Sequence, residues 1–274
     1  MGRNTAVLTM LVVVALIGGA VAAVLSNIVT FTPLNAPAAL SAAAPTQGGI
    51  VFQPPAPQDA PSDLKDAIML GYNIMNDTPK YAPKYSGNKL SCRNCHFDAG
   101  RAKDGISLVG VAAAYPKYRK RTQYATDLVA RTNECFERSM NGHPLPVDSH
   151  EMQALIAYMA WISKDLPMYA HIPWLGVKRL TTDYKANVTN GQTVYQASCF
   201  MCHGANGEGT PSAPPLWGAH SFNDGAGMSH PDTMAAFVKA NMPKGAPVLT
   251  VEQAIDVAGY VKAKPRPHFV ATKD

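Results

Sequence analysis

The chain has 274 residues, of which 16% are charged, and its formal net charge is +5. This length allows two small domains behind an N-terminal segment. Lysine and arginine are scattered rather than clustered, so the charge pattern gives no sign of a nucleic-acid partner.

The first 30 residues read as a signal peptide or a membrane anchor. From Ala6 to Leu25 the only polar side chain is Thr9, and Arg3 is the only charged residue before Asp59. This run matches the ~20 residues that span a bilayer and exceeds the ~7–15 of a signal-peptide core, which favours an uncleaved anchor. Small residues at 20–23 leave cleavage open. With Arg3 on the cytoplasmic side, we expect a periplasmic protein, anchored to the cytoplasmic membrane if the helix is retained.

Residues 31–61 are rich in proline and alanine. Proline disrupts both helices and packed strands, so this stretch reads as an extended, semi-rigid linker. Its expected role is to hold the following domains away from the membrane.

The motif C-x-x-C-H occurs twice, once in each half of the exported part. It is the attachment signature of a c-type haem, in which two thiols bind the haem and the adjacent histidine ligates iron. The alternative is a pair of redox or zinc motifs, but no further Cys or His pairs follow at zinc-ribbon spacing. We therefore predict two haem c groups, bound by Cys92, Cys95, His96, Cys199, Cys202 and His203.

Residues 62–165 are predicted to form a first cytochrome c domain. Ser62 is the expected N-cap of its first helix, whose inner face would carry Leu64, Ala67, Ile68, Gly71, Tyr72 and Met75. The last helix is expected to begin at Asp148, with Glu151 completing a capping box. Its buried stripe would be Met152, Leu155, Ile156, Met159 and Ile162.

Residues 166–184 read as a connection, and residues 185–265 as a second cytochrome c domain. A helix with Gly191 and Tyr195 precedes the second haem motif, and Thr250 with Gln253 would cap the final helix. The inner stripe of that helix would be Val251, Ala254, Ile255, Ala258 and Val261. Because each half repeats the order of helix, haem motif, L-x-G loop and helix, we predict an all-α fold of two tandem domains.

The repeat also indicates the second iron ligand of each haem. Cys135 follows His96 by as many positions as Met242 follows His203. Met228 is a rival for the second haem, and Met140, His143 and His150 are rivals for the first. Met242 and Cys135 could instead be ordinary core residues, since methionine often fills gaps in a core and a lone cysteine is usually a buried hydrophobic residue. As ligands, a thioether would raise the haem potential and a thiolate would lower it.

Arg131, Cys135 and Ser139 are spaced one helical turn apart and share a face. A nearby cation lowers a thiol pKa, and arginine binds oxyanions through two hydrogen bonds. Together with Arg121, these residues could form an anion site suited to a small sulfur oxyanion. The alternative is that the arginines are surface cations or partners of haem propionates.

Two segments resemble the dihaem thiosulfate dehydrogenase family of periplasmic c-type cytochromes, over about residues 62–270. They are Gly87 to Arg101, around the first haem motif, and Asn133 to Gly142, around Cys135. Residues 214–228 and 241–243 are also similar. The Cys135 segment is the specific one, because C-x-x-C-H marks any c-type haem.

The resemblance implies that two thiosulfate ions are joined to tetrathionate, with some members favouring the reverse direction. It assigns iron ligation to His96 and Cys135 in one haem and to His203 and Met242 in the other. It assigns substrate contact to Arg121, Arg131 and Ser139, with Cys135 as the reacting sulfur. Electrons would leave to a soluble cytochrome c or another periplasmic acceptor.

Some relatives carry a lysine directly before the methionine ligand, where it competes for iron. This chain has Asn241 there, and Lys244 is displaced, so a lysine ligand is not expected. Three other functions remain open: a dihaem electron carrier without substrate chemistry, a sulfur-carrier subunit with a partner protein, and a dihaem peroxidase. The peroxidase would need an open iron site, which a cysteine ligand disfavours.

Overall fold

The computed structural model of the chain describes residues 49–120 and 123–271. The predicted N-terminal helix and most of the predicted linker lie outside the described residues. Within the described ranges, no helix is both long enough and apolar enough to cross a membrane.

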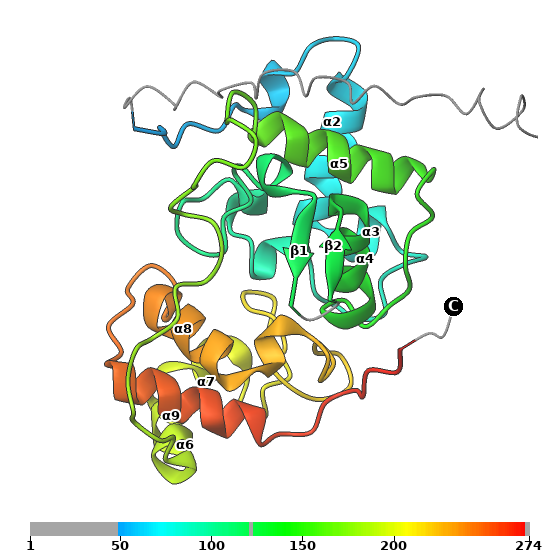
Figure 1. Ribbon diagram of the computed structural model, residues 1–274. Coiled ribbons are helices and arrows are strands. Elements are labelled where there is room, and N and C mark those ends of the chain that lie inside the picture. The colour runs from blue at the N-terminus through cyan, green and yellow to red at the C-terminus, as the bar shows by residue number, and fades with distance from the viewer. Residues whose placement is uncertain (1–48, 121–122, 272–274) are drawn as a thin grey trace, which may run out of the picture. The chain divides into compact units, whose positions relative to one another are not determined.

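The first half of the described chain is built around two crossing helices, α2 (Lys65–Asn76) and α5 (His150–Ile162) (Figure 1). Gly71 allows the close approach, because a Cβ there would collide with the Ala154 carbonyl and with Tyr158. The short helix α3 (Thr78–Tyr81) and the helix α4 (Leu128–Arg138) complete this half. The core between them includes Ile68, Ile74, Phe136, Met152, Leu155, Tyr158 and Ile162.

The second half repeats this crossing with α6 (Val188–Ser198) and α9 (Val251–Lys262). Gly191 lies against the Asp256 carbonyl and Tyr260, as Gly71 lies against Ala154 and Tyr158. The helices α7 (Phe200–His203) and α8 (Pro231–Asn241) lie between them in the chain. The expected internal repeat is therefore present in the helix crossings of both halves.

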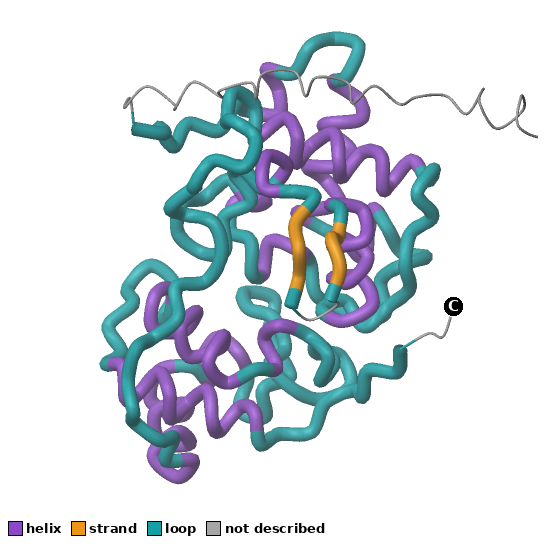
Figure 2. Tube along the Cα trace, in the orientation of Figure 1, coloured by secondary structure: helices purple, strands orange, loops and turns teal. Residues whose placement is uncertain are grey.

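The first half also contains one short antiparallel sheet, formed by β1 (Lys117–Arg119) and β2 (Tyr124–Thr126) (Figure 2). Lys117 pairs with Thr126, and Arg119 pairs with Tyr124. This hairpin was not expected in an all-helical fold. Its strands have three residues each, too few for a clear alternating pattern in the sequence.

The predicted helix starts are shifted in the first half and correct in the second. The chain enters α2 through a turn in which Leu64 N donates to Pro61 O over 3.0 Å, so Ser62 lies before the helix and does not cap it. The cap of α5 is Ser149 rather than Asp148, because the Ser149 hydroxyl accepts from Met152 N. Thr250 and Gln253 form the predicted capping box of α9.

The apolar stripes were predicted in part, since Ile156 in α5 and Val251 and Ile255 in α9 are only half-buried. Leu64 is 47% exposed, whereas Ile74, which was not assigned to the inner face of α2, is fully buried. In α9 the buried face includes Ala254, Ala258 and Val261.

Part of the predicted connection packs against the first half. Ile172 and Trp174 form a small cluster with Val109 and Ala113, and Trp174 Nε1 donates to Val109 O over 2.8 Å. This segment therefore runs along the first half before α6 begins. Short 3₁₀ helices occupy the loops at Pro57–Asp59, Cys92–Asn94, Asp98–Gly100, Ala112–Ala114 and Gly227–Ser229.

Candidate active site

A cavity of about 250 Å³ lies next to the first C-x-x-C-H motif. Its walls include Cys92, Cys95 and His96 of the motif. They also include Arg131 and Cys135 of α4 and Ser139 at the end of that helix. Apolar side chains complete it, among them Met75, Leu90, Leu108, Val111, Leu155 and Met159. Two thiols, an imidazole and an apolar wall are the donor set and surroundings that a haem c requires.

His96 is oriented as a metal-binding histidine. Its Nδ1 lies 2.6 Å from the Ile106 carbonyl, which leaves Nε2 for iron. Burial lowers the pKa of His96 to about 4, so the ring is neutral and can act as a ligand. His203 has the same arrangement, with Nδ1 at 2.8 Å from the Pro214 carbonyl and a pKa lowered by burial.

The attachment cysteines differ in exposure between the two motifs. Burial raises the pKa of the Cys92 thiol to about 11 and that of Cys95 to about 12. The charge of Cys135 adds to both shifts, which reflects its place in the same cavity. In the second motif burial raises the pKa of Cys199 to about 11, whereas Cys202 is exposed.

Arg131 contacts the sulfur of Cys135 directly. Its Nη1 lies 2.8 Å from Cys135 Sγ and 3.7 Å from a Glu134 carboxylate oxygen. The same carboxylate lies 3.3 Å from Arg119, so Glu134 is held between two arginines. The pKa of Arg131 is raised, first by the charge of Cys135, so its guanidinium stays protonated. The cavity therefore contains a fixed cation beside the Cys135 sulfur.

Of the remaining residues predicted for the site in the first half, some line the cavity and others do not. Ser139 caps the C-terminal end of α4 and lines the cavity, and Met140 lines it too and remains a rival ligand. His143 and His150 do not line this cavity. Arg121 lies outside the described residues.

Sequence reasoning missed several side chains of the cavity wall, among them Tyr115 and Lys117. Tyr115 is held by Arg119, whose Nη1 donates to its hydroxyl over 3.0 Å. Lys117 begins β1, and Tyr115 lies just before it and is bonded to Arg119 of the same strand, so a prediction of the hairpin would have pointed to both. Lys117 brings a second cation to the rim.

The second predicted iron ligand of the other half lies at a helix end. Met242 directly follows α8 and is half-buried, while its rival Met228 lies in the 3₁₀ turn Gly227–Ser229. Asn241 is buried and accepts a hydrogen bond from Gly105 N over 2.7 Å. Lys244 Nζ lies 4.7 Å from the centre of the Phe97 ring, where it makes a cation–π contact.

Comparisons with known proteins identify the two halves as cytochrome c domains. Residues 80–168 match the family described as SoxA/TsdA, cytochrome c domain, and residues 188–264 match the cytochrome c family. The chain thus consists of two tandem cytochrome c domains, one in each half, and binds two haem c groups.

Several similar proteins are named thiosulfate dehydrogenase. The chain is 40% identical to a thiosulfate dehydrogenase of Allochromatium vinosum, over 75% of this chain and 80% of that one. It is 41% identical to one of Thiomonas intermedia, over 80% and 72%. A solved thiosulfate dehydrogenase (TsdBA) of Marichromatium purpuratum matches with a TM-score of 0.75 and 34% identity, over 79% of this chain and 50% of that chain. The chain spans half of that solved protein. From its sequence and its fold, this dihaem cytochrome belongs to the thiosulfate dehydrogenase family.

Proposed function

We propose that the chain oxidises two thiosulfate ions to tetrathionate in the cavity beside Cys135 and passes two electrons out through its second domain. One observation supports this most directly: the cavity holds the nucleophilic sulfur of Cys135 and the Arg131 cation 2.8 Å apart, beside the first haem motif. The haem groups, when bound, accept and transfer the electrons.

The anion would be held by the polar side of the cavity. Arg131 offers a guanidinium, which binds oxyanions through paired hydrogen bonds, and Ser139 offers a hydroxyl one turn further along. Arg121, assigned by resemblance, would add a second cation. The neutral His96 imidazole and the Cys135 sulfur would be the two iron ligands of the first haem.

The Cys135 thiolate and the sulfane sulfur of one thiosulfate form a disulfide bond and give up two electrons. The sulfane sulfur of a second thiosulfate attacks the outer sulfur of that bond. Tetrathionate leaves, and the Cys135 thiolate is restored without further change in electron count. Arg131 stabilises the thiolate in the first and last states, since it donates to the sulfur in both.

In the second domain, His203 and Met242 would ligate iron. A neutral thioether favours ferrous iron, so this haem would have the higher potential and draw electrons from the first. The acceptor would be a soluble cytochrome c or another periplasmic protein. The protein would act in the periplasm, held at the membrane if its N-terminal helix is retained.

The test is turnover of the purified holoprotein with thiosulfate and ferricyanide, followed by identification of tetrathionate. Cys135→Ala should abolish turnover, and Met140→Leu, which removes the rival ligand in the same cavity, should leave most of it. Full activity of Cys135→Ala would contradict the mechanism. Electron transfer with no thiosulfate or tetrathionate turnover in either direction would instead identify a simple electron carrier.

A further inference from the structure

The C-terminal end of α4, the helix that carries Cys135, is completed by the other domain. The last four carbonyls of a helix have no partner within the helix and need one elsewhere. Two of those in α4 are satisfied locally, because Met140 N donates to Cys135 O and Gly142 N donates to Phe136 O, both over 2.9 Å. The next two carbonyls, of Glu137 and Arg138, accept hydrogen bonds from the other domain.

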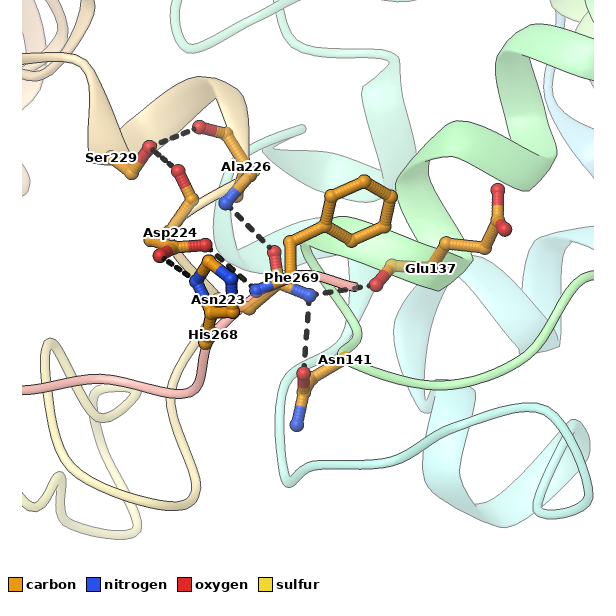
Figure 3. Close-up of polar contacts among 9 residues, drawn as sticks. Glu137, Asn141, Asn223, Asp224, Ala226, Ser229, His268 and Phe269 are labelled. Carbon is orange, nitrogen blue, oxygen red and sulfur yellow. Dashed lines mark hydrogen bonds and ion pairs between the residues drawn. The ribbon is translucent and has the colours of Figure 1, made fainter. Parts of the chain in front are cut away.

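Asn223, from the second domain, donates to both of them. Its side-chain Nδ2 donates to Glu137 O over 2.8 Å, and its backbone N donates to Arg138 O over 3.1 Å. Nδ2 also donates to Asn141 Oδ1 over 3.1 Å (Figure 3). Asn223 is 1% exposed, so these bonds lie away from water, where an unsatisfied carbonyl is costly.

A second asparagine links the two domains at the same helix end. Asn88 Nδ2 donates to Ser139 O over 2.9 Å and to Ser221 O of the second domain over 3.2 Å. Thus the three successive carbonyls after Phe136 all accept hydrogen bonds from amides that lie in the second domain or bond to it.

The Asn223 loop is itself held in place by the C-terminal segment. Phe269 N donates to Asp224 Oδ1 over 2.7 Å, and His268 Nδ1 lies 2.6 Å from Asp224 Oδ2 (Figure 3). The Phe269 ring then stacks on the Arg138 guanidinium, with 4.1 Å between the ring centre and Cζ. The Asn223 loop and α4 are therefore held together both by the Asn223 hydrogen bonds and by the contact between Phe269 and Arg138.

We propose that Asn223 is a positioning residue for Cys135: it caps the helix of the first domain from the second, so the electron-transfer domain holds the reacting sulfur in place. Cys135 lies in the last turn of α4, where the loss of capping bonds is felt first. This inference rests on the proposed function only in taking Cys135 as the reacting group.

The test compares Asn223→Ala with Asn187→Ala in the dihaem holoprotein. Asn187 caps α6 in the same domain through a side-chain bond to Asn190 N and makes no contact with α4 among those described. Both variants lose one asparagine side chain from a helix end, so they are matched in chemistry. Asn223→Ser is a second variant, which leaves a smaller void but whose hydroxyl is too short to replace the amide.

Three quantities are measured: amide hydrogen exchange across α4, the spectrum of the thiolate-ligated haem, and kcat with KM. In Asn223→Ala we expect exchange at residues 135–139 to rise roughly five- to tenfold, as for one buried hydrogen bond lost. The thiolate spectrum should become heterogeneous and kcat should fall by a similar factor. Asn187→Ala should change none of the three, even if it lowers the unfolding midpoint.

Unchanged exchange in α4 for both Asn223 variants would overturn the inference, as would equal changes in Asn187→Ala. If Asn223→Ala does not accumulate with both haems, the same comparison is made with Asn223→Ser. Hydrogen exchange is measured without substrate, so it tests the capping role independently of turnover. A wild-type protein that forms no tetrathionate would refute the proposed function, and the exchange data would still decide whether Asn223 caps α4.

Discussion

Arg131 donates a hydrogen bond from Nη1 to the sulfur of Cys135 over 2.8 Å, from one turn earlier on the same helix. The spacing makes this contact a local consequence of the sequence, since residues four apart on a helix face each other. The same Nη1 lies 3.7 Å from a Glu134 carboxylate oxygen, so the Arg131 guanidinium has two anchoring partners before any anion binds.

Arg131→Lys should weaken both the sulfur contact and anion binding. Lysine keeps the charge but loses the planar fork that makes two parallel hydrogen bonds. Loss of about 1.5–3 kcal/mol, as for a hydrogen bond to a charged group, corresponds to a drop in kcat/KM of roughly 10- to 100-fold. Steady-state kinetics with thiosulfate measures it. Arg179→Lys, at an exposed position, is the matched control and should be neutral; equal losses in both would contradict a specific role.

The identity of the ligand in the second domain can be decided with two matched variants, Met242→Leu and Met228→Leu. Loss of a thioether ligand lowers the haem potential, because the thioether stabilises ferrous iron. A spectroelectrochemical titration should therefore show a lowered potential for the second haem in Met242→Leu and an unchanged one in Met228→Leu. The opposite pattern would transfer the assignment to Met228.

The helix crossing of the second domain should not tolerate a methyl group. Gly191→Ala would place a Cβ against the Asp256 carbonyl and Tyr260, at a cost in unfolding free energy of about 1–3 kcal/mol. At Gly227 a Cβ meets nothing within 4 Å, so Gly227→Ala is the control and should be near neutral. Denaturant titrations of the holoprotein compare them, and an equal midpoint would show that the helices adjust.

The contact of Asp224 with His268 and Phe269 of the C-terminal segment should weaken in acid. The pKa of Asp224 is lowered, first by the hydrogen bond from Phe269 N and then by the one from His268. A folded-state pKa below the unfolded value of about 3.9 gives stabilisation that is present above about pH 4 and is lost as pH falls through the folded-state pKa.

We therefore expect Asp224→Asn to unfold earlier than wild type at neutral pH and to approach it as pH falls below about 4. Thermal unfolding across this range measures the difference. Asp183→Asn, at an exposed position of the connection, should follow wild type throughout. A difference between Asp224→Asn and wild type that does not vary with pH would contradict the charge-based explanation.

Sequence reasoning succeeded where a side-chain cap marks the start of a helix. The capping box of α9 needs only Thr250 and Gln253, which are three residues apart, and it was predicted correctly. The start of α2 was wrong because a turn from Pro61 to Leu64, rather than a side-chain cap, precedes the helix. The hairpin that brings Tyr115 and Lys117 to the cavity was missed because its strands are too short to show a period.

The sequence by itself determined that the chain carries two C-x-x-C-H haem motifs and that Arg131, Cys135 and Ser139 share one helix face. Both follow from contiguous residues or from helical spacing, which need no long-range information. Only the tertiary structure decided what completes the Cys135 helix. Asn223 and Glu137 are 86 positions apart, and neither residue type by itself predicts a hydrogen bond between them. The partner of a helix-end carbonyl depends on which loop the fold brings there, and that is set by how the two domains pack together.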